Sequence, residues 1–463
     1  MRRLSKKALE IRREFAVQWI HYSEALDVEL RQARDEGREL PDTIEAEIEA
    51  IGRMDDFFEK ELAALKLMER IQELPYRADY PYVEPAEYDE IRAECKGTLP
   101  TLPPVDKTKC FDKIYGAILG RCAGNMLGQP VEGWYASRIQ GFMHKTGNAP
   151  ITNYFRSDVD ESIREEFGVS DDGYTHQRPG VNWLNNTTCA PEDDDIDFTL
   201  LGLRLLEEVG PEFEAEDVAL NWLYNFPLYH TAVSERIGYR NIVNKIPSTK
   251  SGRFANPHRE TLGGQIRVDA YGYVCPGDPV KAAAMAWKDA TMTNDKNGIY
   301  GAMYIAAMLA LVAVLDDPRQ IAELGLTQIP ARSRLYEGVR QVLQAYDEGK
   351  SADEVLAMIH TRFDERDPYQ WVHAVGNTMV VVTGFLYGGG DLGEAIGTAV
   401  KTGYDTDCDG ASVGSLTGML VGAKNLPQSW LQGINNTVKT CVAGFDDEIK
   451  LDEFARRMTA LVF

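Results

Sequence analysis

Apolar side chains recur at steps of three and four residues along most of the chain, a spacing that is typical of packed helices. The pattern is clearest over residues 112–128, 195–208, 215–225, 279–316, 333–348, 352–362, 371–387, 392–402, 409–424 and 450–461. No series of alternating apolar and polar residues indicates strands. The pattern therefore predicts an all-α protein, a multi-helix bundle.

The first 75 residues carry two further helical patterns. Apolar residues from Leu4 to Ala33 predict one long helix, and those from Ile44 to Ile71 predict a second. We expect a helical hairpin extension over residues 1–75, either packed on the main domain or acting as a lid or a homodimer contact. Prolines crowd residues 76–108, which we expect to be an extended connection, and we expect residues 109–463 to form the main helical domain.

Composition narrows the classes of partner. The chain has 72 acidic and 49 basic residues and a net charge of −23, whereas binding to a phosphate backbone needs clustered positive charge. Nucleic acid and anionic membranes are therefore excluded as general partners. No apolar stretch is long enough to span a bilayer and no secretory leader is visible, so we expect a cytoplasmic protein. Seven cysteines without a CxxC pair predict reduced thiols rather than a disulfide framework or a zinc site.

Two predicted helices have glycine at every fourth position. Gly116, Gly120, Gly124 and Gly128 line one face of the first, and Gly410, Gly414, Gly418 and Gly422 line one face of the second. Each interior glycine costs about 1 kcal/mol relative to alanine, so a compensating contact is expected. Close approach of the two helix backbones supplies that contact, which predicts that the helix ends meet at a common place.

Acidic residues precede two of these helices. "PEDDDID" (191–197) leads into one and "YDTDCD" (404–409) into the glycine-lined one, about 210 residues later. A single acidic run would be explained by favourable interaction with a helix N-terminus. Two runs that converge on a core helix would repel one another unless protons or divalent cations neutralise them. Oxygen ligands suit magnesium or manganese, so we expect a shared metal site.

A calcium loop is the competing interpretation of the second run. "DTDCDG" matches the first six places of the EF-hand pattern, from Asp405 to Gly410. The twelfth place should then be a bidentate glutamate, but it is Leu416. The EF-hand interpretation is therefore disfavoured.

Three ordered motifs resemble the ADP-ribosylglycohydrolase family, which includes the dinitrogenase-reductase-activating glycohydrolases and the ADP-ribosyl-acceptor hydrolases. They are "DKIYGAILGRCAGNMLGQPVEGW" (112–134), "PEDDDIDFTLLGLRLLEE" (191–208) and "GYDTDCDGASVGSLTGMLVGA" (403–423). The stretches 262–290 and 371–391 are similar to the family's central loop region and to the helix before its second metal motif. The resemblance implies an all-α glycosidase that uses two Mg²⁺ or Mn²⁺ ions to cleave the glycosidic bond of an ADP-ribosyl substrate.

The resemblance also implies roles for individual residues. Glu192, Asp193 and Asp194 would bind one ion, Asp405 and Asp407 would reach both, and Cys408 would complete the second. Glu132, Asp193 and Asp194 would supply the catalytic carboxylates, which activate water or protonate the leaving group. Candidate substrate residues are Gly263, Gly264, Gln265, Arg267, His373, Asn377 and Tyr404. His230 and His373 are each either structural or in contact with substrate.

The chain departs from the family pattern at four positions. Glu192 stands in place of a threonine or serine, Cys408 in place of a hydroxyl ligand, Asn125 in place of an aspartate and Asp409 in place of an asparagine. These departures concern the substrate more than the fold. They leave two alternatives open: hydrolysis of another N-ribosyl small molecule, or a non-catalytic ADP-ribose-binding protein.

Overall fold

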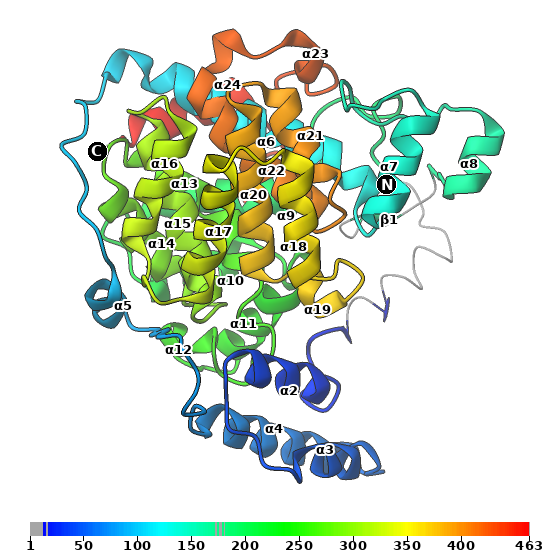
Figure 1. Ribbon diagram of the computed structural model, residues 1–463, viewed down its shortest axis with the longest axis vertical. Coiled ribbons are helices and arrows are strands. Elements are labelled where there is room, and N and C mark those ends of the chain that lie inside the picture. Colours follow the sequence, from blue (N-terminus) through cyan, green and yellow to red (C-terminus); the bar gives the residue numbers. More distant parts are fainter. Residues whose placement is uncertain (1–12, 15–16, 172–173, 176–177, 180, 463) are drawn as a thin grey trace.

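A computed structural model describes residues 13–14, 17–171, 174–175, 178–179 and 181–462. Helices dominate this part of the chain, which confirms the all-α prediction (Figure 1). Its strands are two short antiparallel pairs, β1 (Tyr174–Thr175) with β2 (Arg178–Pro179) and β3 (Thr437–Lys439) with β4 (Glu448–Lys450). None of its helices combines the length and apolar character needed to cross a bilayer.

The main helical domain begins at α6, and its helices follow in chain order. They are α6 (Lys107–Gly128), α7 (Ala136–Lys145), α8 (Glu161–Phe167), α9 (Asp194–Glu208), α10 (Ala215–Asn225), α11 (Val233–Val243), α12 (Ser248–Ser251), α13 (Asp269–Val274), α14 (Pro279–Ala290), α15 (Asn297–Val312), α16 (Pro318–Gly325), α17 (Arg334–Asp347), α18 (Ala352–Arg362), α19 (Pro368–Trp371), α20 (Ala374–Gly388), α21 (Leu392–Val400), α22 (Thr406–Val421), α23 (Gln428–Leu431) and α24 (Leu451–Ala460). Short 3-10 helices η1 (Gln129–Val131), η2 (Leu228–His230), η3 (Leu262–Arg267), η4 (Leu326–Gln328) and η5 (Ala423–Asn425) connect some of them.

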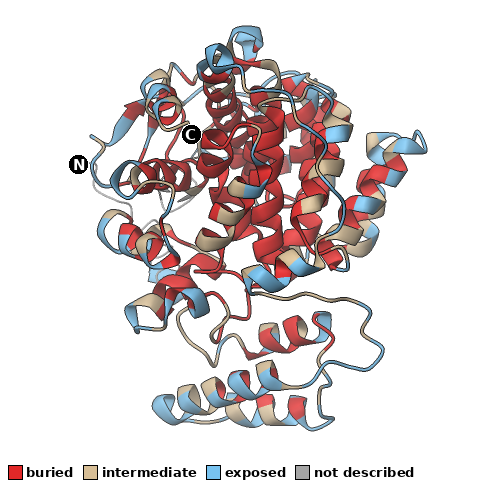
Figure 2. Ribbon diagram, turned by 90° about the vertical axis from the view of Figure 1, so that its left-hand side faces the viewer, coloured by how far each residue is buried: buried red, intermediate tan, exposed pale blue. Residues whose placement is uncertain are grey.

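The core of this domain surrounds α15, in which every residue from Asn297 to Val312 is buried. A helix that is apolar on all sides is stable only inside a protein. Figure 2 shows the buried helices gathered in the middle of the domain, with exposed residues on the outer helices. The glycine-lined helices α6 and α22 belong to the same buried core.

The single helix predicted over 279–316 is wrong, because the chain forms α14 and α15 with a break between Ala290 and Asn297. Asn294 donates hydrogen bonds to the carbonyl of Thr261 at 2.8 Å, and Lys296 has a positive φ of 44°. Asparagine side chains that bind nearby backbone compete with helix formation. The apolar pattern also missed α7, α11 and α16.

Residues 26–73 form three helices, α2 (Leu26–Asp35), α3 (Ile44–Gly52) and α4 (Phe57–Glu73). The one long helix predicted from Leu4 to Ala33 is wrong over 18–25, which form turns, with Trp19 at a φ of 59°. Residues 4–12 and 15–16 of that prediction lie outside the described residues. The second predicted helix is divided between α3 and α4, because Asp56 caps α4 by accepting the Glu59 amide at 2.9 Å.

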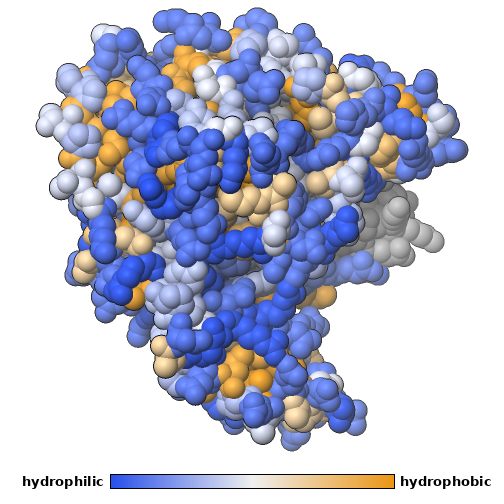
Figure 3. All heavy atoms as spheres, in the orientation of Figure 1, coloured by the Kyte–Doolittle hydropathy of each residue, from blue (hydrophilic) through white to orange (hydrophobic). Residues whose placement is uncertain are grey.

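These three helices share a small apolar core, which Ala255 of the main domain joins, and they lie beneath the main domain in Figure 1. Figure 3 shows an apolar patch on this lower part of the molecule, surrounded by hydrophilic residues. The proline-rich connection leaves them, forms α5 (Tyr88–Glu94) and runs up the side of the main domain to α6 (Figure 1). It is held there by backbone hydrogen bonds such as the one from the Val83 amide to the Arg332 carbonyl.

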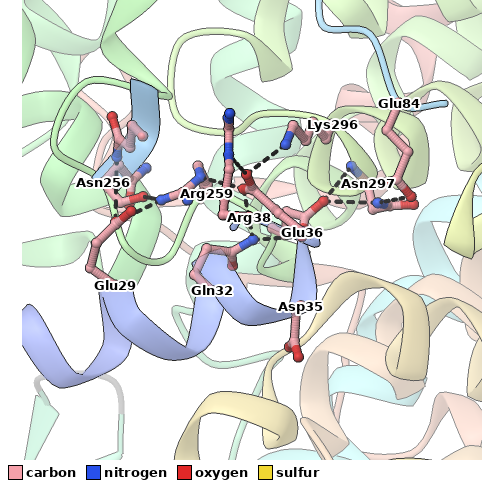
Figure 4. A network of polar contacts seen from close by, with 12 residues as sticks. Glu29, Gln32, Asp35, Glu36, Arg38, Glu84, Asn256, Arg259, Lys296 and Asn297 are labelled. Carbon is pink, nitrogen blue, oxygen red and sulfur yellow. Dashed lines mark hydrogen bonds and ion pairs between the residues drawn. The ribbon is translucent and has the colours of Figure 1, made fainter. Parts of the chain in front are cut away.

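A buried network of charges joins α2 to the main domain (Figure 4). Arg259 contacts Glu29 at 2.7 Å and Glu36 at 2.6 Å, and Lys296 pairs with Glu36 from the other side. Burial alone would raise the pKa of Glu36, but Arg259 and Lys296 outweigh it and hold that pKa well below its ordinary value. The α2 helix is therefore docked on the main domain through paired charges rather than through apolar contact alone.

Candidate metal centre

The glycine faces of α6 and α22 pack against each other in antiparallel directions. A Cβ placed on Gly120 would lie 2.0 Å from the carbonyl oxygen of Gly414, and one on Gly124 would lie 1.8 Å from that of Gly410. Such distances leave no room for any side chain. The two helix backbones therefore touch along their length, as the fourfold glycine spacing predicts.

This packing brings the C-terminal end of α6 against the N-terminal end of α22. A Cβ on Gly128 would lie 2.1 Å from the Thr406 carbonyl oxygen, and the Thr406 hydroxyl donates a hydrogen bond to the Gly128 carbonyl at 2.9 Å. Glu132 follows η1 just beyond the end of α6, whereas Asp405 and Asp407 begin α22. Acidic residues more than 270 positions apart in the sequence are thus neighbours.

The acidic run before α9 joins them through two side chains of α6. Asp193 caps α9 and accepts the Asp195 amide at 3.2 Å, which sets the register of the first turn. Buried Arg121 lies 3.3 Å from the Asp195 carboxylate, and the Asn125 amide donates to the same carboxylate at 3.2 Å. Arg121 also pairs with Asp269 at 3.1 Å. Asp195 is therefore held facing α22.

Two groups of side chains at the start of α22 could each hold a metal ion. Glu132, Asp405 and Asp407 form the first, and Asp195, Asp407 and Cys408 form the second. Within each group the ligand atoms all lie within 4.8 Å of one another. Asp407 belongs to both groups, so the two groups are adjacent and share one carboxylate.

The electrostatics of the site favour a cation. Burial, and then the charges of Asp407 and Glu132, raises the pKa of Asp405 well above its ordinary value. Burial also raises the pKa of Asp195 and of Asp409, and neither carboxyl oxygen of Asp409 has a hydrogen-bond partner in the described part of the chain. Buried carboxylates of this kind stay ionised at neutral pH only when a cation neutralises them. The donor set, mainly carboxylate oxygen, fits hard divalent cations.

The structure places the other predicted ligands around these groups. Asp193 accepts a hydrogen bond from the Gln129 side chain at 2.7 Å, and Asp194 is the partly exposed first residue of α9. Burial raises the pKa of the Cys408 thiol, and the charges of Asp195, Asp405, Asp407 and Asp194 raise it further. Glu192 instead pairs with His230 at 2.8 Å. The roles assigned to these residues stay predictions.

Asp195 is the residue that sequence reasoning missed. It lies inside the acidic run, but which of five neighbouring acids faces inward depends on where α9 begins. Arg121 was a signal, because an arginine in a buried, glycine-rich helix must find a carboxylate. Its partner turned out to be Asp195.

The predicted substrate residues of η3 are all buried. A Cβ on Gly263 would collide with the Glu235 carboxylate, and Gly264 faces Asn294 and the Gly298 carbonyl. Gln265 accepts a hydrogen bond from Thr378 at 2.6 Å, and Arg267 pairs with Asp289. These contacts are with core residues rather than with the two acidic groups.

The predicted substrate residues around α20 and before α22 differ in access, because His373 borders a cavity whereas Asn377 and Tyr404 are completely buried. His373 caps α20 and lines a cavity of about 160 Å³. Asn377 donates to the Trp371 and His373 carbonyls, both at 2.9 Å. The Tyr404 ring stacks on His360 at 4.9 Å, and His360 lines a cleft of about 930 Å³.

Comparison with known proteins identifies the domain around this site. A family model described as ADP-ribosylglycohydrolase matches residues 106–460. A solved structure, described as an ADP-ribosylglycohydrolase-related protein complex, is 18% identical with a TM-score of 0.46, and the alignment covers 77% of this chain and 98% of that chain. No curated protein matches the chain significantly.

Proposed function

Because the chain belongs to the ADP-ribosylglycohydrolase family and is a glycosidase-type hydrolase, we propose that it cleaves the glycosidic bond of an ADP-ribosyl group at a centre of two divalent cations. The observation that carries this proposal is the pair of ligand groups that share Asp407. A carboxylate shared by two adjacent ligand groups could hold two cations close together, as two-ion hydrolysis needs.

The proposed ions are Mg²⁺ or Mn²⁺. Glu132, Asp405 and Asp407 would hold one, and Asp407, Asp195 and Cys408 would hold the other. Divalent cations in such a site bind sugar hydroxyls, orient the ribose and make bound water more acidic. A thiol is a softer ligand than a hydroxyl, so Cys408 makes the second position better suited to manganese than to magnesium.

Side chains of the protein would accept and donate the protons that hydrolysis transfers. Glu132 is only half-buried, unlike Asp405 and Asp407, so its carboxylate is the one in the first group that substrate and water can reach. We assign it the proton of the attacking water. Asp194, also partly exposed, would donate a proton to the leaving atom, whereas Asp193, held by Gln129, would position α9.

Isothermal titration of ADP-ribose tests the proposal. Metal-free protein should bind ADP-ribose weakly, and loading with Mg²⁺ or Mn²⁺ should create binding. Asp407→Asn should abolish that gain, because it removes the ligand common to both groups. Asp316→Asn, a change at a side chain that is 92% exposed, is the matched control and should leave it intact.

The outcomes separate the alternatives. Metal-dependent ADP-ribose binding that survives in Asp407→Asn contradicts the two-ion centre. Metal binding without ADP-ribose binding moves the search to other N-ribosyl compounds. A metal-dependent complex that never releases ribosyl product, whether from ADP-ribosylated proteins or small conjugates, indicates a non-catalytic binding protein.

A further inference from the structure

A second cluster of metal-ligand side chains lies beside α9, outside the two acidic groups. It consists of Glu192, His230 and Cys441, whose ligand atoms all lie within 4.8 Å of one another. We propose that these three residues bind a zinc ion that ties three distant segments of the chain together. The proposal is independent of the hydrolase function, because none of the three belongs to either acidic group.

Backbone pairing positions two of the ligands. Ala190 forms a parallel bridge with Val438, with hydrogen bonds of 3.0 Å and 3.1 Å to the flanking residues of β3. Glu192 lies two residues after Ala190, and Cys441 lies three residues after Val438. Both ligands therefore follow the same backbone bridge, which brings their two segments together.

The third ligand comes from η2. His230 ends that turn, and its Nδ1 atom lies 2.8 Å from the Glu192 carboxylate. The loop between β3 and β4 is tied to the end of α10, just before η2, because the Ala443 amide donates to the Asn225 carbonyl at 2.9 Å. The cluster thus gathers the segment before α9, the end of η2 and the loop between β3 and β4.

The donor set is that of zinc rather than of magnesium. One imidazole nitrogen, one thiol sulfur and one carboxylate oxygen are the three donor types found around zinc, whereas hard ions take oxygen. Tetrahedral zinc keeps its ligand atoms about 3.3 to 3.7 Å apart. The ligand atoms all lie within 4.8 Å of one another, and the Glu192–His230 contact of 2.8 Å would open by about 0.5 Å to admit the ion. Three protein ligands leave a fourth position for water.

Burial and a supporting carboxylate complete the site. The Glu192 side chain is 3% exposed, whereas that of His230 is 26% exposed, so an ion can enter from solvent. The Cys441 thiol contacts the Asp197 carboxylate at 3.1 Å, and Thr440 hydrogen-bonds to the same carboxylate. The Asp197 carboxylate also accepts a hydrogen bond from the Cys441 backbone amide at 3.4 Å, so Asp197 holds the loop that carries Cys441 and is a positioning residue.

The proposed zinc would act on the catalytic end of the domain through the chain itself. Glu192 directly precedes Asp193, the cap of α9, and Asp195 follows two residues later. Fixing Glu192 to His230 and Cys441 would therefore fix the start of α9. The odd cysteine count and lack of a CxxC pair hide this site from sequence inspection, because its ligands are about 40 and 210 residues apart.

Cobalt substitution of the full chain tests the proposal. Metal-free protein is loaded with Co²⁺ in excess Mg²⁺, and the near-ultraviolet absorption of a cobalt–thiolate bond is recorded. We expect the band in the unaltered chain, in Cys408→Ser and in Cys95→Ser, and its loss in Cys441→Ser. Cys408→Ser is essential because Cys408 belongs to an acidic group. Cys95 is a part-buried cysteine that belongs to none of the three ligand groups.

Zinc titration gives a second readout that does not depend on the thiol band. Unaltered protein should bind one zinc ion per chain in excess Mg²⁺, and His230→Gln should weaken binding by at least about 100-fold, more than the loss of a supporting residue. His230 is partly exposed, so this variant should fold.

Three results would overturn the proposal. The first is no cobalt–thiolate band in the unaltered chain. The second is a band that disappears in Cys408→Ser but persists in Cys441→Ser. The third is zinc affinity unchanged by His230→Gln, which would leave the Glu192–His230 contact as a simple ion pair.

Discussion

Replacing Gly128 by alanine should disturb the metal centre, whereas the same change at Gly116 should only destabilise the fold. Both residues lie on the glycine face of α6. A Cβ on Gly128 would meet the Thr406 carbonyl oxygen at 2.1 Å and the Asp407 amide at 2.4 Å. A Cβ on Gly116 would meet the Gly418 carbonyl oxygen at 2.3 Å.

The expected losses of stability and of metal affinity follow from these distances. Real Cβ contacts are essentially never shorter than 3.0 Å, so α6 and α22 must separate locally by nearly 1 Å. Overpacking of a core costs about 1–3 kcal/mol, and occasionally more; backbone on both sides places these two variants at the upper end. At Gly128 the atoms that move carry Asp407, so divalent-metal affinity should fall about 10- to 100-fold.

Position along the helix distinguishes the two variants. Gly116 lies twelve residues from Gly128, about 18 Å along α6. Effects separated by more than about 10 Å are nearly independent, so Gly116→Ala should keep its metal affinity within about twofold. Gly52→Ala, at a helical glycine with nothing within 4 Å, should stabilise slightly and controls for intrinsic helix propensity.

The assay pairs urea unfolding with Mn²⁺ titration for the three variants. The reasoning is refuted if Gly128→Ala binds Mn²⁺ like the unaltered protein, or if Gly116→Ala loses affinity equally. Unfolding free energies of Gly128→Ala and Gly116→Ala that match that of Gly52→Ala would refute the close packing itself.

Three further predictions concern the rest of the molecule. Arg259→Met removes the cation that pairs with buried Glu29 and Glu36, and it should lower the free energy of unfolding in urea by about 3–5 kcal/mol. Arg53→Met, at an exposed ion pair, is the control and should change that free energy little. Equal losses in the two variants would contradict the docking role of the buried network. Burial, with Arg259 nearby, lowers the pKa of His258 to about 4. Between about pH 6.5 and 4, His258 is therefore protonated in the unfolded chain but stays neutral in the folded protein. Stability should therefore fall by up to about 3 kcal/mol over that window, and His258→Gln but not His144→Gln should remove this fall; equal pH dependence of the two variants would reject it. The homodimer expected through residues 1–75 predicts a doubled mass in solution that Phe58→Glu halves, because Phe58 is 80% exposed on α4; a monomer mass for the unaltered chain rejects it.

Residue spacing was sufficient to predict those features that depend on one face of a single helix. The fourfold glycine spacing in α6 and α22 predicted close packing, because a face without side chains can be used only by another backbone. Apolar residues every three or four positions predicted the all-α class, because that spacing forms one buried face along a helix. The break between α14 and α15 escaped this reasoning, since a few polar side chains such as Asn294 bind backbone that is distant in the sequence.

Sequence by itself determined that two acidic runs precede core helices, and that their charges need neutralising. Only the tertiary structure decided which acids meet. The Asp193 cap sets the register of α9, and Arg121, from another helix, selects Asp195 to face Asp407 and Cys408. Likewise Glu192, His230 and Cys441 carry no common pattern, because their proximity comes from a strand bridge and a turn in separate parts of the chain. Helix formation depends on near neighbours, which a sequence displays, whereas the convergence of charges depends on long-range packing, which it does not.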